Sequence, residues 1–552
     1  MKRSIHLHGT IVPILLLLFF AEPVRSQVDS SLNTEPAERL MGLQFSGAKR
    51  DSMREALSEQ LESYKKLRSV NLANSVVPAV QFNPIPHGFT IEKKKRKSVF
   101  SKHGSVKRPA NLEELAFLSV GELAELVRSR KITSLELTQM YLGRLKKFRP
   151  MLECVITLTE SLAIEQARRA DREIARGKYR GLLHGIPYGA KDLLAAKEYP
   201  TTWGSVPYKN QVIGENATVI NRLEEAGAVL VAKLTLGELA WGDVWFGGMT
   251  RNPWNLKQGS SGSSAGSASA TAAGLVAFAI GSETYGSIVS PSTRCGTTGL
   301  RPTYGRVSRK GAMALSWSMD KLGPICRTVE DCAIVFNAIY GTDPEDPTLI
   351  DAPFNYSPKV DMKKLRIGYY KSAFDSVKNY KDQSDAALEV MKRLGAQLIS
   401  IDLPRTYPVD DLGIILSAEA GAAFDELTRS GKDDLMVRQI KNAWPNVFRA
   451  SRFIPAVEYI QANRIRTLLI EDMQRVMNTI DVYVTPSFGG DNLLLTNLTG
   501  HPCVVLPNGF TKEGTPTSIS FVGKLFDEAT LLAVAKQYQD ATGFHLKHPT
   551  LQ

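Results

Sequence analysis

The stretch GSSGSSAGSASATAAGLVAFAIGSETYGSIVSP, residues 259–291, decides the interpretation of this 552-residue chain. Its glycine, serine and alanine residues let a backbone approach a ligand closely and leave N–H groups unshielded. A run of such N–H groups stabilises the oxyanion that forms when a nucleophile attacks a carbonyl, and the hydroxyls supply a nucleophile and a proton carrier. A flexible linker is the alternative for a Gly/Ser-rich segment. Residues 268–280, however, are apolar and Ala-rich, and predict a helix that runs to about Ala279.

Residues 262–266 also match the G-x-S-x-G motif that holds the nucleophile of an α/β-hydrolase esterase. That motif has to follow a buried strand, whereas residues 252–258 have the composition of a loop. The partner histidine is missing as well, because His184 and His501, in the body of the domain, stand in no suitable motif. The esterase interpretation is therefore disfavoured.

A neutral lysine can activate a serine where histidine is scarce. The segment GIPYGAKD, residues 185–192, places Lys191 after an apolar run shaped by glycine and proline. Burial lowers the pKa of a lysine by several units from about 10.4. An ordinary surface pair of Lys191 with Asp192 is the alternative, and without the family motif the residues alone favour it.

From Ser119 onward, helical and strand patterns alternate. Ser119 with Glu122, and Thr133 with Glu136, form predicted capping boxes, the second before a helix that runs toward Lys147. The predicted strands are residues 155–158, 228–232, 365–369, 482–484 and 503–506, with helices between most of them. This alternation predicts an α/β fold with a single large mixed sheet covered on both faces by helices.

Three regions are predicted along the chain. Residues 1–26 have a charged start and an apolar run, Ile11 to Ala21, typical of a signal peptide cut near Ser26/Gln27, which predicts a secreted or periplasmic protein. An uncleaved membrane anchor is the alternative. Residues 27–110 form a helical N-terminal extension and basic linker, with two helices broken near Ser46–Gly47, an extended segment at residues 76–89 and a basic run at residues 93–97. Residues 111–552 form the catalytic domain.

The net charge of +12 is uneven, because residues 27–108 contribute fifteen Lys or Arg against eight Asp or Glu. The basic run is interpreted as a solvated linker rather than as a site for an anionic surface. A nucleic-acid partner is not expected. The five cysteines fit no zinc pattern; a pair between Cys326 and Cys332 stays open, although buried thiols are favoured.

Taken together, the motifs resemble those of the amidase signature family of serine hydrolases. The matching residues are 185–187 with 191–192, 261–267, 285–288, 295–296, 299–307, Asp320 with 323–324 and 327–331, 497–502, and 526–530. They follow the family's order from about residue 115 to 545, and the joint match is specific. The resemblance implies the family's α/β fold.

The resemblance also implies a Ser–cis-Ser–Lys triad of Ser287, Ser263 and Lys191. Ser263 rather than Ser260 or Ser261 is the relay, because the family's spacing of 24 residues back from Ser287 reaches Ser263. The family pattern further implies an oxyanion hole of backbone N–H groups from Thr284, Tyr285, Gly286 and Ser287. It names Ser264 as a supporting residue and requires no metal or organic cofactor.

The chain departs from the family pattern around the nucleophile. Tyr285 stands for the usual glycine and is compatible if its φ allows. Glu283 stands for the usual Asp, and Val289 for the Arg that pairs with it. We therefore expect Glu283 to pair with Arg294 as a second supporting residue and so preserve a buried charge balance.

The resulting functional prediction is an amidase that hydrolyses a carboxamide to a carboxylate and ammonia through a seryl acyl-enzyme, similar to exported peptide amidases. The rival is the amidotransferase A subunit, which normally carries a long stretch before NLxG; here only ten residues separate Pro486 from Asn497. The expected partner is a small-molecule or peptide amide, with no membrane span after signal cleavage, and a homodimer is compatible with the sequence. Candidate walls of the acyl pocket are Trp203, Trp241, Trp245, Phe246, Trp254 and Trp317.

Overall fold

The computed structural model describes residues 33–551, so the predicted signal peptide lies outside the described residues. The chain divides into two compact units, Met1–Leu72 and Ala73–Gln552. In the first unit, α1 (Glu35–Leu40) and α2 (Gly47–Arg68) are joined by an ion pair between Glu38 and Arg50 at 2.9 Å. The predicted pair of helices with a break near Ser46–Gly47 is therefore confirmed.

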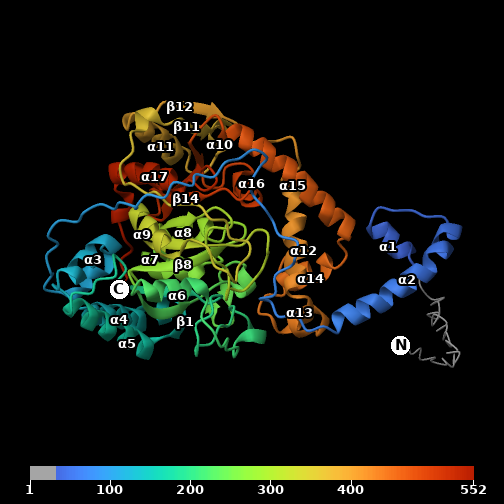
Figure 1. The fold of residues 1–552 in the computed structure, drawn as a ribbon, viewed down its shortest axis with the longest axis horizontal. Helices are drawn as coiled ribbons and strands as arrows, with labels where there is room; N and C mark the ends of the chain where they lie inside the picture. Colours follow the sequence, from blue (N-terminus) through green and yellow to red (C-terminus); the bar gives the residue numbers. More distant parts are fainter. Residues whose placement is uncertain (1–32, 552) are drawn as a thin grey trace, which may run out of the picture. The chain divides into compact units, whose positions relative to one another are not determined.

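An 11-stranded mixed sheet forms the centre of the second unit (Figure 1). Its order is β1-β3-β2-β8-β10-β9-β14-β15-β13-β11-β12. The bounds in that order are Val155–Leu158, Val229–Leu234, Pro187–Lys191, Phe278–Glu283, Lys321–Cys326, Thr298–Arg301, Cys503–Phe510, Pro516–Gly523, Val482–Pro486, Ile367–Tyr370 and Leu398–Ile401. β2 pairs in parallel with β3 and β8, and β11 with β12 and β13, while the strands from β8 to β13 pair antiparallel.

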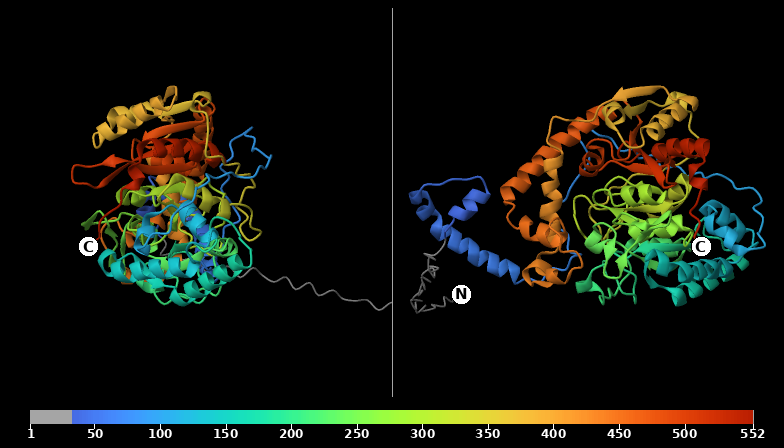
Figure 2. Two further views of the ribbon diagram at one scale, coloured as in Figure 1. Left: turned by 90° about the vertical axis from the view of Figure 1, so that its left-hand side faces the viewer. Right: turned by 180° about the vertical axis from the view of Figure 1, so that it is seen from behind.

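Helices cover both faces of this sheet, as Figure 2 shows. Their bounds are α3 Val120–Arg128, α4 Ser134–Leu152, α5 Glu160–Ala175, α6 Thr218–Glu225, α7 Ala265–Ala272, α8 Val289–Cys295, α9 Val329–Ile339, α10 Lys371–Ser376, α11 Lys381–Arg393, α12 Ile414–Ala423, α13 Asp425–Arg429, α14 Trp444–Ser451, α15 Ala456–Met477, α16 Asn492–Leu498 and α17 Glu528–Thr542. The predicted α/β class and the single two-sided sheet are confirmed.

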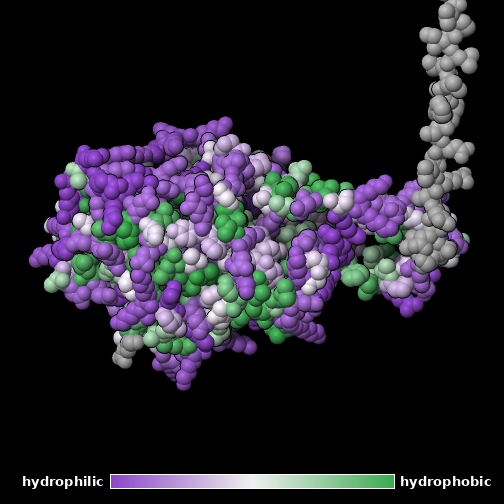
Figure 3. Space-filling model, turned by 90° about the horizontal axis from the view of Figure 1, so that it is seen from below, coloured by the Kyte–Doolittle hydropathy of each residue, from purple (hydrophilic) through white to green (hydrophobic). Residues whose placement is uncertain are grey.

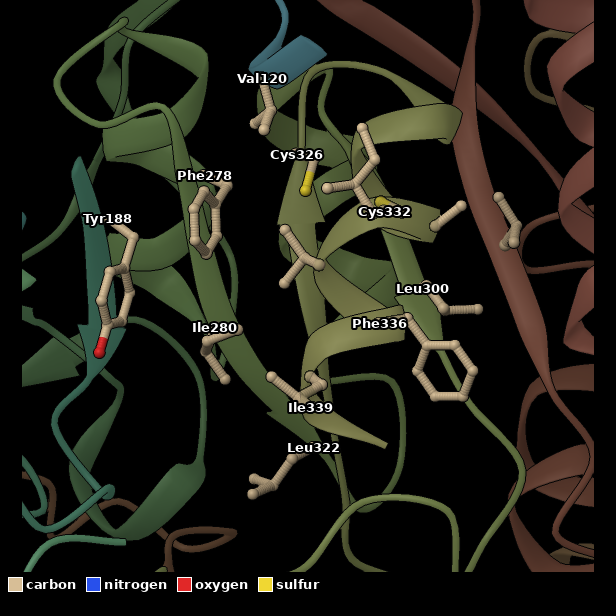
Figure 4. Close-up of a cluster of buried hydrophobic side chains, with 14 of the residues drawn as sticks. Val120, Tyr188, Phe278, Ile280, Leu300, Leu322, Cys326, Cys332, Phe336 and Ile339 are labelled. Atoms are coloured by element: carbon tan, nitrogen blue, oxygen red, sulfur yellow. The ribbon is translucent and has the colours of Figure 1, made fainter. Parts of the chain in front are cut away.

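Strand alternation divides the core between the two faces. Side chains at successive strand positions point to opposite faces. Val504 and Leu506 of β14 accordingly join the largest core cluster with α9 and α17, whereas Cys503 and Val505 join a second cluster with α15 and α16. Figure 4 shows part of the largest cluster, in which the rings of Tyr188 and Phe278 stack at 5.3 Å. Apolar residues at consecutive strand positions are therefore buried on both sides.

Local start signals are confirmed, and one helix is placed wrongly. Both capping boxes form, with the Ser119 and Thr133 hydroxyls each accepting the backbone N–H three residues on. The helix predicted to about Ala279 instead ends at Ala272, and Phe278–Glu283 is the strand β8. Gly274, with φ +64°, turns the chain, and β8 then pairs with β2 in the middle of the sheet. Pairing with neighbouring strands thus overrides the helix propensity of an Ala-rich run.

All five cysteines are free and buried, so the expectation of buried thiols is confirmed. Within residues 33–551, no helix combines the length and apolarity that a bilayer span requires. On the face drawn in Figure 3, small apolar areas lie between hydrophilic residues. Scattered exposed apolar side chains of this kind are ordinary on folded proteins.

Candidate active site

Lys191 is the last residue of β2, a strand inside the sheet, and it is fully buried. Its Nζ donates to Ser263 Oγ at 2.8 Å, to Ser282 Oγ at 2.8 Å and to Ser264 Oγ at 3.2 Å. Burial lowers the pKa of Lys191 to about 7, against the opposing charges of Asp320 and Glu283. The environment of Lys191 therefore consists of hydroxyls, and a large neutral fraction exists near pH 7.

The neighbouring acid does not neutralise this lysine. Asp192 is held by Lys233 at 2.6 Å, and it accepts hydrogen bonds from the backbone N–H and the hydroxyl of Thr202. Lys233 sits on β3 opposite Ala190, one position away from Lys191, so its side chain points to the other face of the sheet. The alternative of a surface Lys191–Asp192 pair is therefore wrong, because both residues are buried and Asp192 has a different partner.

Ser263 and Ser264 lie in the tight loop that enters α7. The peptide bond between Gly262 and Ser263 is cis. A Cβ atom on Gly262 would lie 1.8 Å from the carbonyl oxygen of Gly242, so only glycine fits there. Ser264 N–H donates to the carbonyl of Ser287 at 3.1 Å, which ties this loop to the predicted nucleophile.

Ser287 lies between the end of β8 and the start of α8, with 8% of its surface exposed. Among the described residues, none forms a hydrogen bond with Ser287 Oγ, and such contacts are often long in proteins without substrate. Gly286 has φ +83°, whereas Tyr285 has a negative φ. The tyrosine in place of the usual glycine is thus compatible with the turn, and its ring is half exposed.

Glu283 is the acid that supports this turn. Its Oε2 accepts the backbone N–H groups of Ile288 and Val289, at 2.8 and 2.9 Å, directly after Ser287. Its Oε1 accepts from Arg301 at 2.8 Å and from Asn497 at 2.9 Å. Burial raises the pKa of Glu283, but the charge of Arg301 and these hydrogen bonds outweigh burial and bring it to about 2. The carboxylate is therefore ionised and fixes the backbone that carries Ser287.

The expected pair between Glu283 and Arg294 is wrong. Arg294 is exposed near the end of α8, whereas Arg301 on β9 is fully buried and reaches the carboxylate from within the sheet. Arg301 also donates to Thr496 Oγ1 at 2.8 Å and to the carbonyl of His501 at 3.0 Å. A buried acid requires a buried cation, and Arg301 meets that requirement.

A cavity of about 220 Å³ adjoins the predicted oxyanion hole. Ser282 and Thr284 are among its lining residues, and Thr284 Oγ1 donates to Asp320 at 2.6 Å. Its apolar walls come from Leu193, Ala240, Met313, Leu315, Trp317 and Leu322. Of the six predicted aromatic walls, Trp317 lines this cavity, and its indole Nε1–H has no hydrogen-bond partner in the part of the chain that the structure describes.

The esterase alternative lacks its base. His184 is hydrogen-bonded to Arg180 N–H and lies against Glu173, and His501 is bonded to Thr499 Oγ1. The residues before Ser263 form β7 (Asn255–Gly259), which pairs only with β6 (Arg251–Asn252) and is no part of the main sheet. Within the described residues, no group of His, Cys, Asp or Glu is arranged to hold a metal ion.

Three site residues carry no predicted role: Ser282 contacts Lys191, Lys233 pairs with Asp192, and Asn497 contacts Glu283. Ser282 is the easiest of the three to predict from the sequence, because it lies in the quoted stretch five residues before Ser287. Lys233 and Asn497 reach the site only through the sheet and α16, so their contacts depend on pairing between distant segments.

Comparison with known proteins gives one family. A family model described as Amidase matches residues 136–494. The A subunit of glutamyl-tRNA(Gln) amidotransferase from Carboxydothermus hydrogenoformans is 34% identical over 487 residues, 79% of this chain and 100% of that protein.

Solved structures show the same similarity. Native peptide amidase from Stenotrophomonas maltophilia has a TM-score of 0.71 at 28% identity, covering 78% of this chain and 98% of that chain. The A subunit of glutamyl-tRNA(Gln) amidotransferase from Thermotoga maritima has a TM-score of 0.67 at 26% identity, covering 79% of this chain and 96% of that chain.

Proposed function

Because this chain belongs to the amidase signature family, we propose that it hydrolyses a primary carboxamide through an acyl-enzyme on Ser287. The observation that carries the proposal is the buried Lys191, whose Nζ contacts Ser263 Oγ at 2.8 Å and whose pKa is lowered to about 7 by burial. A lysine that is partly neutral near pH 7 can act as a base, and the serine next to it can pass the proton on.

The proposed reaction has two halves. Neutral Lys191 takes the proton of Ser263, Ser263 takes the proton of Ser287, and Ser287 Oγ forms a bond to the carbonyl carbon. Backbone N–H groups of residues 284–287 stabilise the oxyanion, in the proposed arrangement. The relay then protonates the leaving nitrogen, the C–N bond breaks, and ammonia departs. Water attacks the ester in the same way and releases the carboxylate.

The identity of the amide has two candidates. Curated relatives are named as the A subunit of glutamyl-tRNA(Gln) amidotransferase, which favours glutamine and a role in supplying ammonia to a partner protein. The similarity to peptide amidase, and the short connection between β13 and α16 where the amidotransferase normally carries a long stretch, favour a stand-alone hydrolase. By name, the curated relatives support the amidotransferase more directly.

Ammonia release from a panel of amides separates these candidates. The panel comprises glutamine, peptides with a C-terminal carboxamide, aromatic amides and aliphatic amides. Turnover of glutamine alone supports the amidotransferase role, and turnover of the other amides without glutamine supports the stand-alone hydrolase.

Ser287→Ala tests the nucleophile within the same panel. We expect it to abolish release, with Ser290→Ala as the matched control because, among the described residues, the partner of Ser290 Oγ is Ser261 Oγ at 2.7 Å. Undiminished release by Ser287→Ala would refute the proposed function.

We also propose export, since residues 1–26 have the charged start and apolar run of a signal peptide. N-terminal sequencing of the protein recovered from its native host tests this. A mature N-terminus near Gln27 supports export with cleavage, and an intact Met1 contradicts cleavage of the signal peptide.

A further inference from the structure

Residues 74–91, here called the strap, lie outside the part of the chain that the family model matches. They contain no helix or strand, yet they run along the larger unit beside α12 and α15 (Figure 1). The strap belongs to the same compact unit as the candidate active site. Its course is fixed by specific contacts rather than by backbone pairing.

Asn74 anchors the start of the strap. Its Oδ1 accepts the backbone N–H of Ala314 at 2.7 Å, and its Nδ2 donates to the carbonyl of Ala314 at 2.9 Å. Both polar atoms of the side chain thus bind the backbone donor and acceptor of one residue. The next residue, Leu315, donates its N–H to Asp320, whose other oxygen binds Thr284. Asn74 is therefore connected to the turn of Ser287 through a short chain of hydrogen bonds.

Three contacts hold the rest of the strap. The ring of Phe82 meets Tyr304 edge-on, with centroids 5.0 Å apart, and the guanidinium of Arg466 lies 3.5 Å from the Phe82 centroid. Arg466 is itself buried. Further along, the backbone N–H of His87 donates to Glu471 at 2.8 Å. The strap is thus held at its start, middle and end.

The strap forms part of the wall of the cavity next to the predicted oxyanion hole. Asn74, Ser75 and Val77 line this cavity together with Ser282 and Thr284. The volume is about 220 Å³. A cavity of about 150 Å³ holds a benzene molecule, so by volume this space admits a group of about one aromatic ring and no long chain. Charged side chains, among them Arg309, Lys310 and Asp320, line it together with the apolar ones.

We propose that the strap determines substrate specificity by closing the acyl pocket, so that the enzyme accepts carboxamides of compact acyl groups and excludes long-chain fatty amides. This inference rests on the proposed function, because it takes Ser287 as the nucleophile that the acyl group must reach. The lining residues contributed by the strap precede the segment that the family model matches, so they would distinguish this chain from relatives that lack the strap.

Fluorophosphonate probes test the strap without knowledge of the natural amide. Ser287 Oγ would bond to phosphorus and displace fluoride, and the rate would report how well the alkyl group fits the pocket. We would compare an ethyl with a dodecyl probe and locate the label by mass spectrometry. Asn74→Ala should raise the dodecyl-to-ethyl rate ratio by about tenfold, the scale on which pocket contacts discriminate. Gln81→Ala, an exposed position of the same strap, should leave the ratio unchanged.

A second variant distinguishes a change in the size of the pocket from a general loosening of the structure. Val77→Trp adds bulk to the part of the cavity wall that the strap forms, and it should slow labelling by a benzyl probe while leaving the ethyl probe unaffected. Ser287 labelled with an unchanged ratio in Asn74→Ala, or with an equal change in Gln81→Ala, would overturn the role of the strap alone. Absence of any label on Ser287 in the wild type would overturn the proposed function and the inference with it.

Discussion

Burial lowers the pKa of Lys191, and among the described residues no carboxylate forms an ion pair with its Nζ. The adjacent acid, Asp192, is bound by Lys233, and the three groups nearest the amine are serine hydroxyls. An acid in that position would stabilise the ammonium and raise the pKa. Asp192 thus has its own cation in Lys233, and the hydrogen-bond partners of Lys191 are serines.

The pH dependence of kcat/KM should follow this lysine. Its pKa is lowered from the usual value to about 7, so the neutral base is lost as pH falls through 7. We expect kcat/KM to rise with a midpoint near pH 7 and to reach a plateau above it. A pH–rate profile from pH 5 to 9 checks this, and a rate independent of pH across that range would contradict the assignment.

Lys191→Arg should remove the base while keeping the positive charge. A guanidinium stays protonated in proteins, so it cannot accept the proton of Ser263. We expect kcat to fall by about 10²- to 10⁴-fold, the usual contribution of general acid–base catalysis. Steady-state kinetics at pH 8 measure the loss, and circular dichroism confirms that the variant is folded.

Arg301 and Arg294 provide a matched pair for the charge balance at Glu283. Arg301→Met leaves the buried carboxylate without its cation and should cost about 3–5 kcal/mol in the free energy of unfolding. Arg294→Met, at an exposed position, should change it by no more than about 0.5 kcal/mol. Urea unfolding of both variants distinguishes these outcomes. Equal effects would mean that Arg301 is not the residue that balances the charge of Glu283.

At the scale of elements, replacing a loop glycine with alanine and replacing a helix glycine with alanine should have opposite effects on stability. Gly262→Ala would force a Cβ against the Gly242 carbonyl and should destabilise the loop and abolish activity. Gly143 lies exposed within α4, and a Cβ added there would meet no atom within 4 Å, so Gly143→Ala should stabilise the protein by about 0.5–1 kcal/mol. Thermal unfolding and ammonia release measure both effects.

Helix starts could be predicted because their signals are local. The hydroxyl of Thr133 and the carboxylate of Glu136 bind backbone groups within the same turn, so spacing alone defines them. β8 could not be predicted in this way, because it continues an Ala-rich run and contains Ala279 and Gly281, which favour no strand in isolation. Its conformation is set by β2 and β10, whose residues lie far away in the sequence.

In the candidate site, too, the motif residues could be predicted from the sequence, whereas a contact between distant segments could not. The family resemblance supplied Lys191, Ser263 and Ser287, and the structure brings Lys191 against Ser263. The partner of Glu283 was placed seven residues too early in the chain, at Arg294. Sequence proximity favoured Arg294, but α8 exposes that side chain while β9 buries Arg301, and burial depends on where the strand enters the sheet.

For the molecule as a whole, the cysteine thiols should not react with thiol reagents in the native state. Burial raises the pKa of Cys154 to about 12 and that of Cys503 to about 11, so neither forms a reactive thiolate near neutral pH. We expect a thiol reagent to label less than one cysteine in the native protein and all five in denaturant. A reductant should leave the melting temperature unchanged, and a shift would point to a disulfide.

The central pairing of β9 with β14 has a consequence for biosynthesis. Leu300 lies opposite Val504, so the edge of β9 stays unpaired until its partner strand is synthesised, about 200 residues later. Until then a nascent chain presents an open strand edge, which is a template for association with other chains. Premature termination before Cys503 should therefore yield insoluble protein rather than a smaller soluble enzyme, and a ribosome-bound chaperone would be most useful during that interval.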